Sequence, residues 1–114
     1  MGAPKKPTEP VSVRQIARTF AKCAPVFQAL GEPARQQIIL MLAETDTMNV
    51  GEIASRMDLS RPAISHHLKV LREADLVKAK RRGTENFYAL TINPALALLT
   101  RFVAEVEACE PDVT

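Results

Sequence analysis

Residues 60–74 read Ser-Arg-Pro-Ala-Ile-Ser-His-His-Leu-Lys-Val-Leu-Arg-Glu-Ala, and this stretch has the pattern of an amphipathic helix. Ser60 suits the N-cap of that helix and Pro62 its first turn. At about 100° per residue, one side carries the polar and basic residues Arg61, Ser65, Lys69 and Arg72. The other side packs into a core and consists of Ile64, His67, Leu68 and Leu71. Such a helix fits the DNA major groove, where Arg, Lys and Ser side chains read base edges.

The segment before this helix supplies the first half of a helix-turn-helix. Residues 49–52, Asn-Val-Gly-Glu, form a capping-box pattern that opens a short helix through Met57. Three residues, 58–60, then separate Met57 from Arg61, which suits the tight turn of the motif. The N-terminal end of the second helix, the recognition helix, reaches base edges in this motif. We therefore expect DNA contacts from Ser60, Arg61, Pro62, Ser65, His66 and Lys69.

A basic hairpin is predicted after the recognition helix. Asp75 suits a left-handed C-cap, although glycine is more usual there. Residues 76–82 and 86–90 have the pattern of two strands joined around Gly83. Cations at a hairpin tip follow phosphates or enter the minor groove, and here they are Lys78, Lys80, Arg81 and Arg82. An edge strand protected by lysine is the simpler interpretation of the same residues.

Three further helices complete the expected fold. A capping box over residues 12–15 opens the first, whose apolar stripe is interrupted near Pro25. Pro33 starts the second helix, and Asn93-Pro94 supplies an N-cap and a first-turn proline for the last, which continues through Ala108. The sequence therefore predicts a mainly α fold, with five helices and two antiparallel strands in a winged helix-turn-helix arrangement.

The first and last predicted helices carry more apolar surface than a single subunit needs. Burying each such side chain stabilises by roughly 1.5–3 kcal/mol, so covering the stripes of two copies would favour association. We expect a homodimer interface formed by Ile16, Phe20, Cys23, Phe27, Leu99, Phe102, Val103 and Val106. The alternative is that both helices cover only their own subunit's core. A dimer would place two recognition helices about one DNA turn, roughly 34 Å, apart.

Length and charge limit the class of protein. The 114 residues suit one folded domain over residues 12–109, with a disordered tail at 1–11 and a flexible end at 110–114. The net charge is only +2, but residues 61–82 carry seven cations against two carboxylates, which indicates a localised anionic partner. No apolar run approaches the roughly 20 residues of a membrane span, and no signal sequence is recognisable. We therefore expect a cytoplasmic protein without membrane contact.

Three segments together strongly resemble the ArsR/SmtB family of bacterial repressors. They are residues 29–40 (Ala-Leu-Gly-Glu-Pro-Ala-Arg-Gln-Gln-Ile-Ile-Leu), the region 59–77 around the recognition helix, and residues 82–90 (Arg-Gly-Thr-Glu-Asn-Phe-Tyr-Ala-Leu). The resemblance covers roughly residues 12–109. It implies a winged-helix dimer, joined through its first and last helices, that represses promoters by occupying an inverted repeat. Asp75 stands where this family usually has glycine.

The metal sites found in this family lack their ligands here. Residues 50–55, which open the helix before the recognition helix, contain no Cys or His, and the last helix contains no His. His66 and His67 are adjacent, so they point about 100° apart on a helix and do not share one metal. We interpret His67 as a partly buried packing residue. We expect neither a metal nor a cofactor.

Two cysteines leave a thiol-based signal open. Cys23 on the first helix and Cys109 near the end of the last would meet if these helices pair, within or across subunits. Thiolates oxidise and bind soft metals, so the pair could serve as a switch. Two small apolar residues that pack are the simpler interpretation.

Signatures of enzymes are missing from the sequence. It has no Gly-rich phosphate loop, no His-Glu-x-x-His and no Gly-x-Ser-x-Gly pattern. We therefore expect a sequence-specific DNA-binding regulator, a homodimeric repressor on an inverted-repeat operator with an unidentified effector. One alternative is a thiol- or soft-metal-responsive repressor that uses Cys23 and Cys109. The other is a winged-helix module that docks an acidic protein, which leaves the Ser-Arg-Pro-x-x-Ser-His pattern unexplained.

Overall fold

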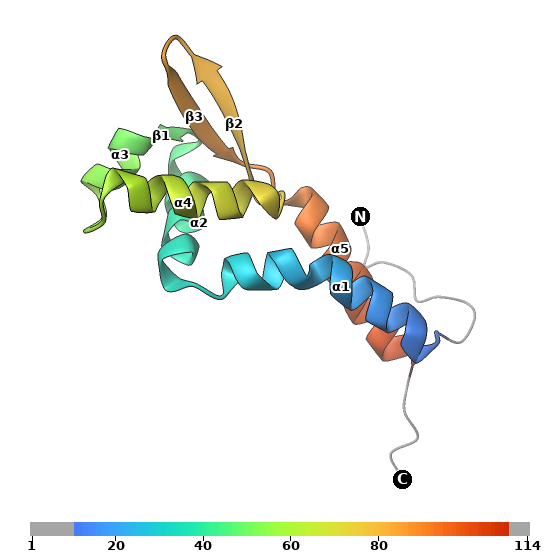
Figure 1. The fold of residues 1–114 in the computed structure, drawn as a ribbon. Helices are drawn as coiled ribbons and strands as arrows, with labels where there is room; N and C mark the ends of the chain where they lie inside the picture. Colours follow the sequence, from blue (N-terminus) through green and yellow to red (C-terminus); the bar gives the residue numbers. More distant parts are fainter. Residues whose placement is uncertain (1–10, 110–114) are drawn as a thin grey trace.

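Helices form most of the structure, a computed structural model that describes residues 11–109. The elements in chain order are α1 (Val13–Leu30), α2 (Pro33–Thr45), β1 (Met48–Asn49), α3 (Val50–Ser55), α4 (Arg61–Glu73), β2 (Val77–Arg82), β3 (Glu85–Leu90) and α5 (Asn93–Ala108). Figure 1 shows α1 and α5 side by side in an arm that extends from a body made of the other elements. The helices and the hairpin confirm the predicted winged helix-turn-helix fold.

The predicted tails fall almost entirely outside the described residues. The described part begins at Val11, one residue before the predicted domain, and the Val11 side chain is buried. It ends at Cys109, where the predicted domain also ends.

The first helix begins where the sequence predicts but is not interrupted. Ser12 Oγ accepts the Gln15 N–H at 3.1 Å, which is one half of the predicted capping box. The other half is absent because the Gln15 side chain donates instead to Glu105 Oε2, at 2.8 Å. The helix also continues through Pro25, which corrects the predicted break. Pro25 and Ala21, whose carbonyl the proline leaves without an N–H, are both exposed, so water can satisfy that oxygen.

The core lies beneath the recognition helix α4. The inward faces of α1 to α4 meet there, because each helix carries apolar residues at helical spacing. Its largest fully buried apolar side chains are Ile38, Leu42, Met48, Ile53, Ile64, Leu68, Leu71 and Val26. Pro33 stands at the start of α2, as predicted. This core fixes the face that α4 turns outward.

Caps stabilise the helix-turn-helix at the start of α3 and at the end of α4. Asn49 and Glu52 form the full predicted capping box of α3, with a 2.8 Å bond from Glu52 N to Asn49 Oδ1. The helix ends at Ser55, two residues before Met57. At the end of α4, Asp75 adopts φ 55°, the predicted left-handed cap. Schellman-type bonds from Asp75 N to Arg72 O and from Leu76 N to Leu71 O close it.

The sheet has one strand more than predicted. Its order is β1-β3-β2, all antiparallel, and β1 joins by pairing Met48 with Tyr88. A two-residue strand is too short for an alternating pattern to reveal it in the sequence. The hairpin strands begin at Val77 and at Glu85, and the pairing of Arg82 with Glu85 leaves a two-residue turn. Gly83 takes φ 62° in that turn, the left-handed conformation that favours glycine.

The last helix starts at Asn93, the residue that the sequence predicts as its N-cap. Asn93 is already helical, and Ile92 occupies the N-cap without a side-chain hydrogen bond. Pro94 lies in the first turn, as predicted, because its missing N–H has no partner to lose there. None of the described helices is long and apolar enough to cross a membrane.

Candidate nucleic-acid interface

The recognition helix presents an exposed polar face at its N-terminal end. Ser60 Oγ accepts the Ala63 N–H at 3.3 Å and so fixes the point at which the helix starts. The structure brings the predicted residues of this region together on one exposed surface: Ser60, Arg61, Pro62, Ser65, His66 and Lys69. Arg72 continues the same exposed face toward the C-terminus. The apolar side of α4 packs on the core, so its polar side stays exposed along the length of the helix and is free to bind a ligand.

The guanidinium of Arg61 lies over α3. A Cβ added to Gly51 would come 3.2 Å from Arg61 Nη2, so the absence of a side chain at Gly51 leaves room for this group. Gly51 lies in the first turn of α3, the first helix of the motif. Arg61 is thus positioned by both helices of the motif.

His66 and His67 have different surroundings. His66 is exposed, whereas His67 is half-buried, with its Nδ1 3.2 Å from Arg35 Nη1. A guanidinium only donates, so Nδ1 accepts and the ring is neutral, with its proton on Nε2. Burial lowers the pKa of His67, and the Arg35 charge lowers it further. The structure thus gives His67 the packing role that the sequence indicates.

Arg35 joins three helices through one guanidinium. It belongs to α2, and its Nε donates to Ala29 O at 2.8 Å while its Nη2 donates to Gln28 O at 3.0 Å. Both are carbonyls of the last turn of α1, and Gln28 O also accepts the N–H of the C-cap residue Gly31 at 3.3 Å. The third contact is the one to His67 on α4. Sequence reasoning missed Arg35, because nothing local marks a residue that acts between helices.

The wing divides its cations between two faces. Alternation along β2 puts Lys78, Lys80 and Arg82 on one face and Arg81 on the other. All four side chains are exposed. Arg81 Nε donates to Gly83 O at 3.1 Å, and the Arg82 guanidinium lies 5.1 Å from the centre of the Phe87 ring. The predicted basic tip is therefore two surfaces, which the period-2 spacing of these residues already indicates.

The arm exposes an apolar surface on α1 and α5. Phe20 is 51% exposed and Val103 53%, and the rings of Phe20, Phe27 and Phe102 pack edge to face at 4.9–5.9 Å between centres. Of the predicted interface residues, the structure exposes Phe20, Phe27, Val103 and Val106. It half-buries Ile16, Leu99 and Phe102. Cys23 lies on no surface, because its side chain is fully buried.

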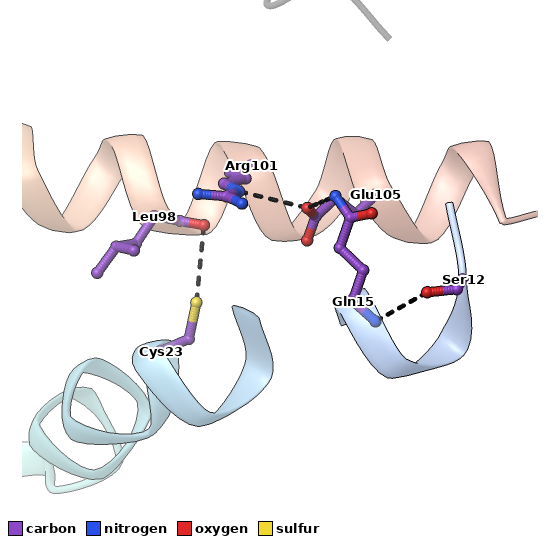
Figure 2. Close-up of polar contacts among 6 residues, drawn as sticks. All are labelled: Ser12, Gln15, Cys23, Leu98, Arg101 and Glu105. Atoms are coloured by element: carbon purple, nitrogen blue, oxygen red, sulfur yellow. Dashed lines mark hydrogen bonds and ion pairs between the residues drawn. The ribbon is translucent and has the colours of Figure 1, made fainter. Parts of the chain in front are cut away.

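A buried carboxylate fixes α1 against α5 inside this arm (Figure 2). Glu105 Oε2 accepts from Gln15 Nε2 at 2.8 Å and from Arg101 Nε at 3.3 Å. The Thr19 hydroxyl is the largest cause of the lowered pKa of Glu105, and its effect outweighs the opposite effect of burial. The carboxylate is therefore charged and held by donors from both helices.

The two cysteines are not brought together within one subunit. Cys23 Sγ lies 3.6 Å from Leu98 O, its hydrogen-bond acceptor (Figure 2). Leu98 and Cys109 are eleven positions apart on the same helix, about 16 Å along its axis, whereas a disulfide needs Cα atoms within roughly 7 Å. Burial raises the pKa of the Cys23 thiol, and the Glu105 carboxylate raises it further. Within residues 11–109, no three His, Cys, Asp or Glu side chains are grouped to hold a metal.

Comparison with known proteins shows which family has this sequence and fold. Residues 32–79 match the model of the bacterial regulatory protein, arsR family. A transcriptional regulator of Methanocaldococcus jannaschii is 44% identical over 60% of this chain and 78% of its own. Transcriptional repressor SdpR of Bacillus subtilis is 38% identical over 57% of this chain and 71% of its own. The chain belongs to the ArsR family.

Solved structures agree with this ArsR-family assignment. Reduced HlyU from Vibrio cholerae has a TM-score of 0.65 and 29% identity, covering 82% of this chain and 97% of the other. An ArsR-like regulator from Rhodococcus sp. RHA1 has a TM-score of 0.68 and 32% identity, covering 80% of this chain and 85% of the other. The ArsR-family protein is thus a DNA-binding transcriptional regulator and not an enzyme, as the sequence predicts.

Proposed function

We propose that this ArsR-family protein is a homodimeric repressor that acts in the cytoplasm and binds an inverted-repeat operator without using the family's metal sites. The observation that carries the proposal is the exposed N-terminal face of α4, from Ser60 to Lys69, above a core that holds the helix in place. A helix of this kind enters the major groove with its N-terminal residues nearest the bases.

The contacts separate into two kinds. Arg61, Ser65 and His66 read base edges, with Pro62 and Lys69 beside them in the groove and Ser60 near the backbone. The wing cations Lys78, Lys80, Arg81 and Arg82 contact phosphates or the minor groove. Base contacts give specificity, and phosphate contacts give affinity and salt dependence.

The dimer forms through the arm. Phe20 and Phe27 of α1 and Val103 and Val106 of α5 are apolar and exposed, as expected of a face that a second copy covers. An isologous contact of two arms would set the two recognition helices one DNA turn apart, which fits the half-sites of an inverted repeat.

Repression is the proposed direction of regulation, since a dimer on its operator blocks access to the promoter. The names of related proteins include both repressors and activators. SdpR of Bacillus subtilis is a transcriptional repressor, and HlyU of Vibrio cholerae is a transcriptional activator. A reporter gene under the chain's own promoter decides between the two directions: repression predicts more reporter in the absence of the protein.

Binding to its own upstream DNA tests the core of this proposal. Fluorescence anisotropy would compare the promoter with a scrambled duplex at two salt concentrations, with reductant present. We expect nanomolar affinity for the promoter, at least about a thousandfold tighter than for the scrambled duplex. Weak and equal binding to both, lost as salt rises, would instead favour the docking of an acidic protein.

The thiol-responsive alternative has a direct test. Cys23→Ser and Cys109→Ser, singly and together, would be compared with the unchanged protein in the same anisotropy assay under an oxidant. The buried, high-pKa Cys23 thiol argues against this mechanism, because the thiolate is the reactive form. If the unchanged protein loses operator binding under the oxidant and the variants do not, the thiol-responsive mechanism is supported.

A further inference from the structure

A groove lies between the C-terminal end of α2 and one face of the wing. Its volume is about 450 Å³, within the range of sites that hold small molecules. Apolar side chains from both elements line it, among them Leu42 and Ala43 of α2 and Phe87 and Leu90 of β3. The elements that line the groove, α2 and the strands β2 and β3, lie away from the arm that α1 and α5 form (Figure 1).

Three cations line the same groove. Lys78, Lys80 and Arg82 point from β2 to this side, because they alternate along the strand and pair across it with residues 89, 87 and 85. Arg82 covers one face of the Phe87 ring, which closes part of the apolar lining beneath a positive charge.

The positive charge of this groove is largely uncompensated. Asp46 is the one carboxylate among its lining residues. Glu85 stands opposite Arg82 on the hairpin, but its Oε2 accepts from Asn49 Nδ2 at 3.2 Å. Within the described part of the chain, no carboxylate lies at ion-pairing distance from Lys78 or Lys80. Ammonium groups without ion-pair partners next to an apolar surface suit a ligand that has both an anionic group and an apolar part.

We propose that this groove binds a small amphiphilic anion, a molecule with an oxyanion head and an apolar tail. The head is held by Lys78 and Lys80, and the tail lies against Ala43, Phe87 and Leu90. A purely charged ligand would leave the apolar lining wet, and a purely apolar one would bury part of the lysine charge without compensation.

Occupancy of the groove has a consequence for regulation. The lysines that hold the head are also residues of the proposed DNA interface, so a bound anion removes them from the phosphates. The ligand would then release the operator, and this consequence rests on the proposed function. Ligand binding itself needs no DNA and is measured separately.

The test uses the full chain without DNA and three probes: decanoate, decanol and acetate. Two-dimensional NMR of the ¹⁵N-labelled protein would locate binding, and calorimetry would measure its strength. We expect decanoate to shift the amides of Ala43, Phe87 and Leu90, with decanol and acetate binding at least about tenfold more weakly. Decyl phosphate in place of decanoate would show which oxyanion head is preferred.

Variants separate the groove from general charge attraction. Lys78→Gln with Lys80→Gln removes the head contacts and should weaken decanoate binding about tenfold or more. Arg18→Gln with Lys22→Gln removes the same charge from exposed positions of α1 and should leave it unchanged. Ala43→Phe fills the groove from an exposed position without altering any charge, and should also abolish binding.

Two results would overturn the proposal. One is decanoate shifts confined to the arm, around Phe20 and Val103, which would mean that the tail binds only the exposed apolar face. The other is equal loss in both charge variants with no effect of Ala43→Phe. Because DNA is absent, either result would leave the operator proposal untouched, and failure of operator binding would not affect this groove.

Discussion

Two side chains of the recognition helix have separate roles, one on its exposed face and one in its packing. Arg61 is set between α3 and α4 with its guanidinium exposed, so it is available to a base. His67, six positions along, faces inward and is fixed by Arg35. The sequence predicts both roles, since helical spacing separates the two faces. It does not reveal Arg35 as the partner, because that contact joins residues 32 positions apart.

Arg61→Ala should reduce binding to the operator by roughly 1–3 kcal/mol and relax specificity at one base pair, because it removes a proposed base contact. Lys80→Ala should weaken binding to all sequences alike and reduce the salt slope by about one, because it removes a proposed phosphate contact. Anisotropy titrations on operator and random duplexes at several salt concentrations measure both. Equal losses on the two duplexes for Arg61→Ala would contradict its base-reading role.

His67 should make folding stability fall in mild acid. Its pKa is lowered from the ordinary 6.5 in the folded protein, so the unfolded chain takes up the proton first. The contribution is therefore complete above pH 6.5 and is lost as the pH falls below that value toward the lower folded pKa. Urea unfolding at pH 7.5 and near pH 5.5 (about one unit below the ordinary value) would show the loss.

His67→Asn is the matched control for this effect, since an amide oxygen can still accept from Arg35 but does not titrate. The variant should lose less stability than the unchanged protein between the same two pH values. The lowered pKa of Glu105 affects folding stability only below about pH 4.5, the ordinary pKa of this group, which is outside the pH range of this experiment. An identical pH dependence in both proteins would exclude His67 as its source.

At the scale of elements, caps and alternation make most of the fold predictable. The capping box at Asn49, the N-cap at Ser60 and the left-handed Asp75 are local signals, and each lies where the sequence places it. The pairing of β1 with β3 and the passage of α1 through Pro25 depend on neighbours distant in sequence, so local patterns missed them. Burial of Cys23 against α5 is of the same kind.

Gly51→Ala tests how α3 positions Arg61. Alanine in place of a helical glycine should stabilise the fold by roughly 0.5–1 kcal/mol. The new Cβ would stand 3.2 Å from Arg61 Nη2 and displace the guanidinium, so operator binding should weaken, by less than in Arg61→Ala. Thermal unfolding and anisotropy on the same preparation give both quantities. Unchanged operator affinity would mean that Arg61 needs no positioning by α3.

The whole molecule consists of a body with an exposed basic surface and an arm with an exposed apolar surface. The body carries the exposed basic residues of α4 and the wing, and the arm carries the exposed phenylalanines and valines of α1 and α5. The sequence predicts the apolar stripes of the arm. It cannot separate residues on the exposed face from those that pair α1 with α5, and Cys23, which lies on the same stripe, is buried between the helices.

Val103→Glu should convert the proposed dimer to a monomer without unfolding the subunit, because this side chain is 53% exposed in the single subunit. Operator affinity should fall with it, since a monomer engages one half-site. Leu40→Glu is the matched control: it introduces the same charge at a 66% exposed apolar position on α2, outside the arm. Light scattering after size-exclusion chromatography measures the mass of each variant. A monomeric Leu40→Glu or a dimeric Val103→Glu would contradict an interface on the arm.

The carboxylate of Glu105 limits how the arm can evolve. Sliding α1 by one turn, about 5.4 Å, would take Gln15 and Thr19 away from the buried Glu105 carboxylate and leave it with Arg101 of its own helix, and the loss of donors to a buried charge is destabilising. The two helices therefore have one permitted alignment, set inside the arm and independent of its outer surface. Duplicated genes can diversify the outer residues, and so choose new partners or reject old ones, while each subunit keeps the same internal frame.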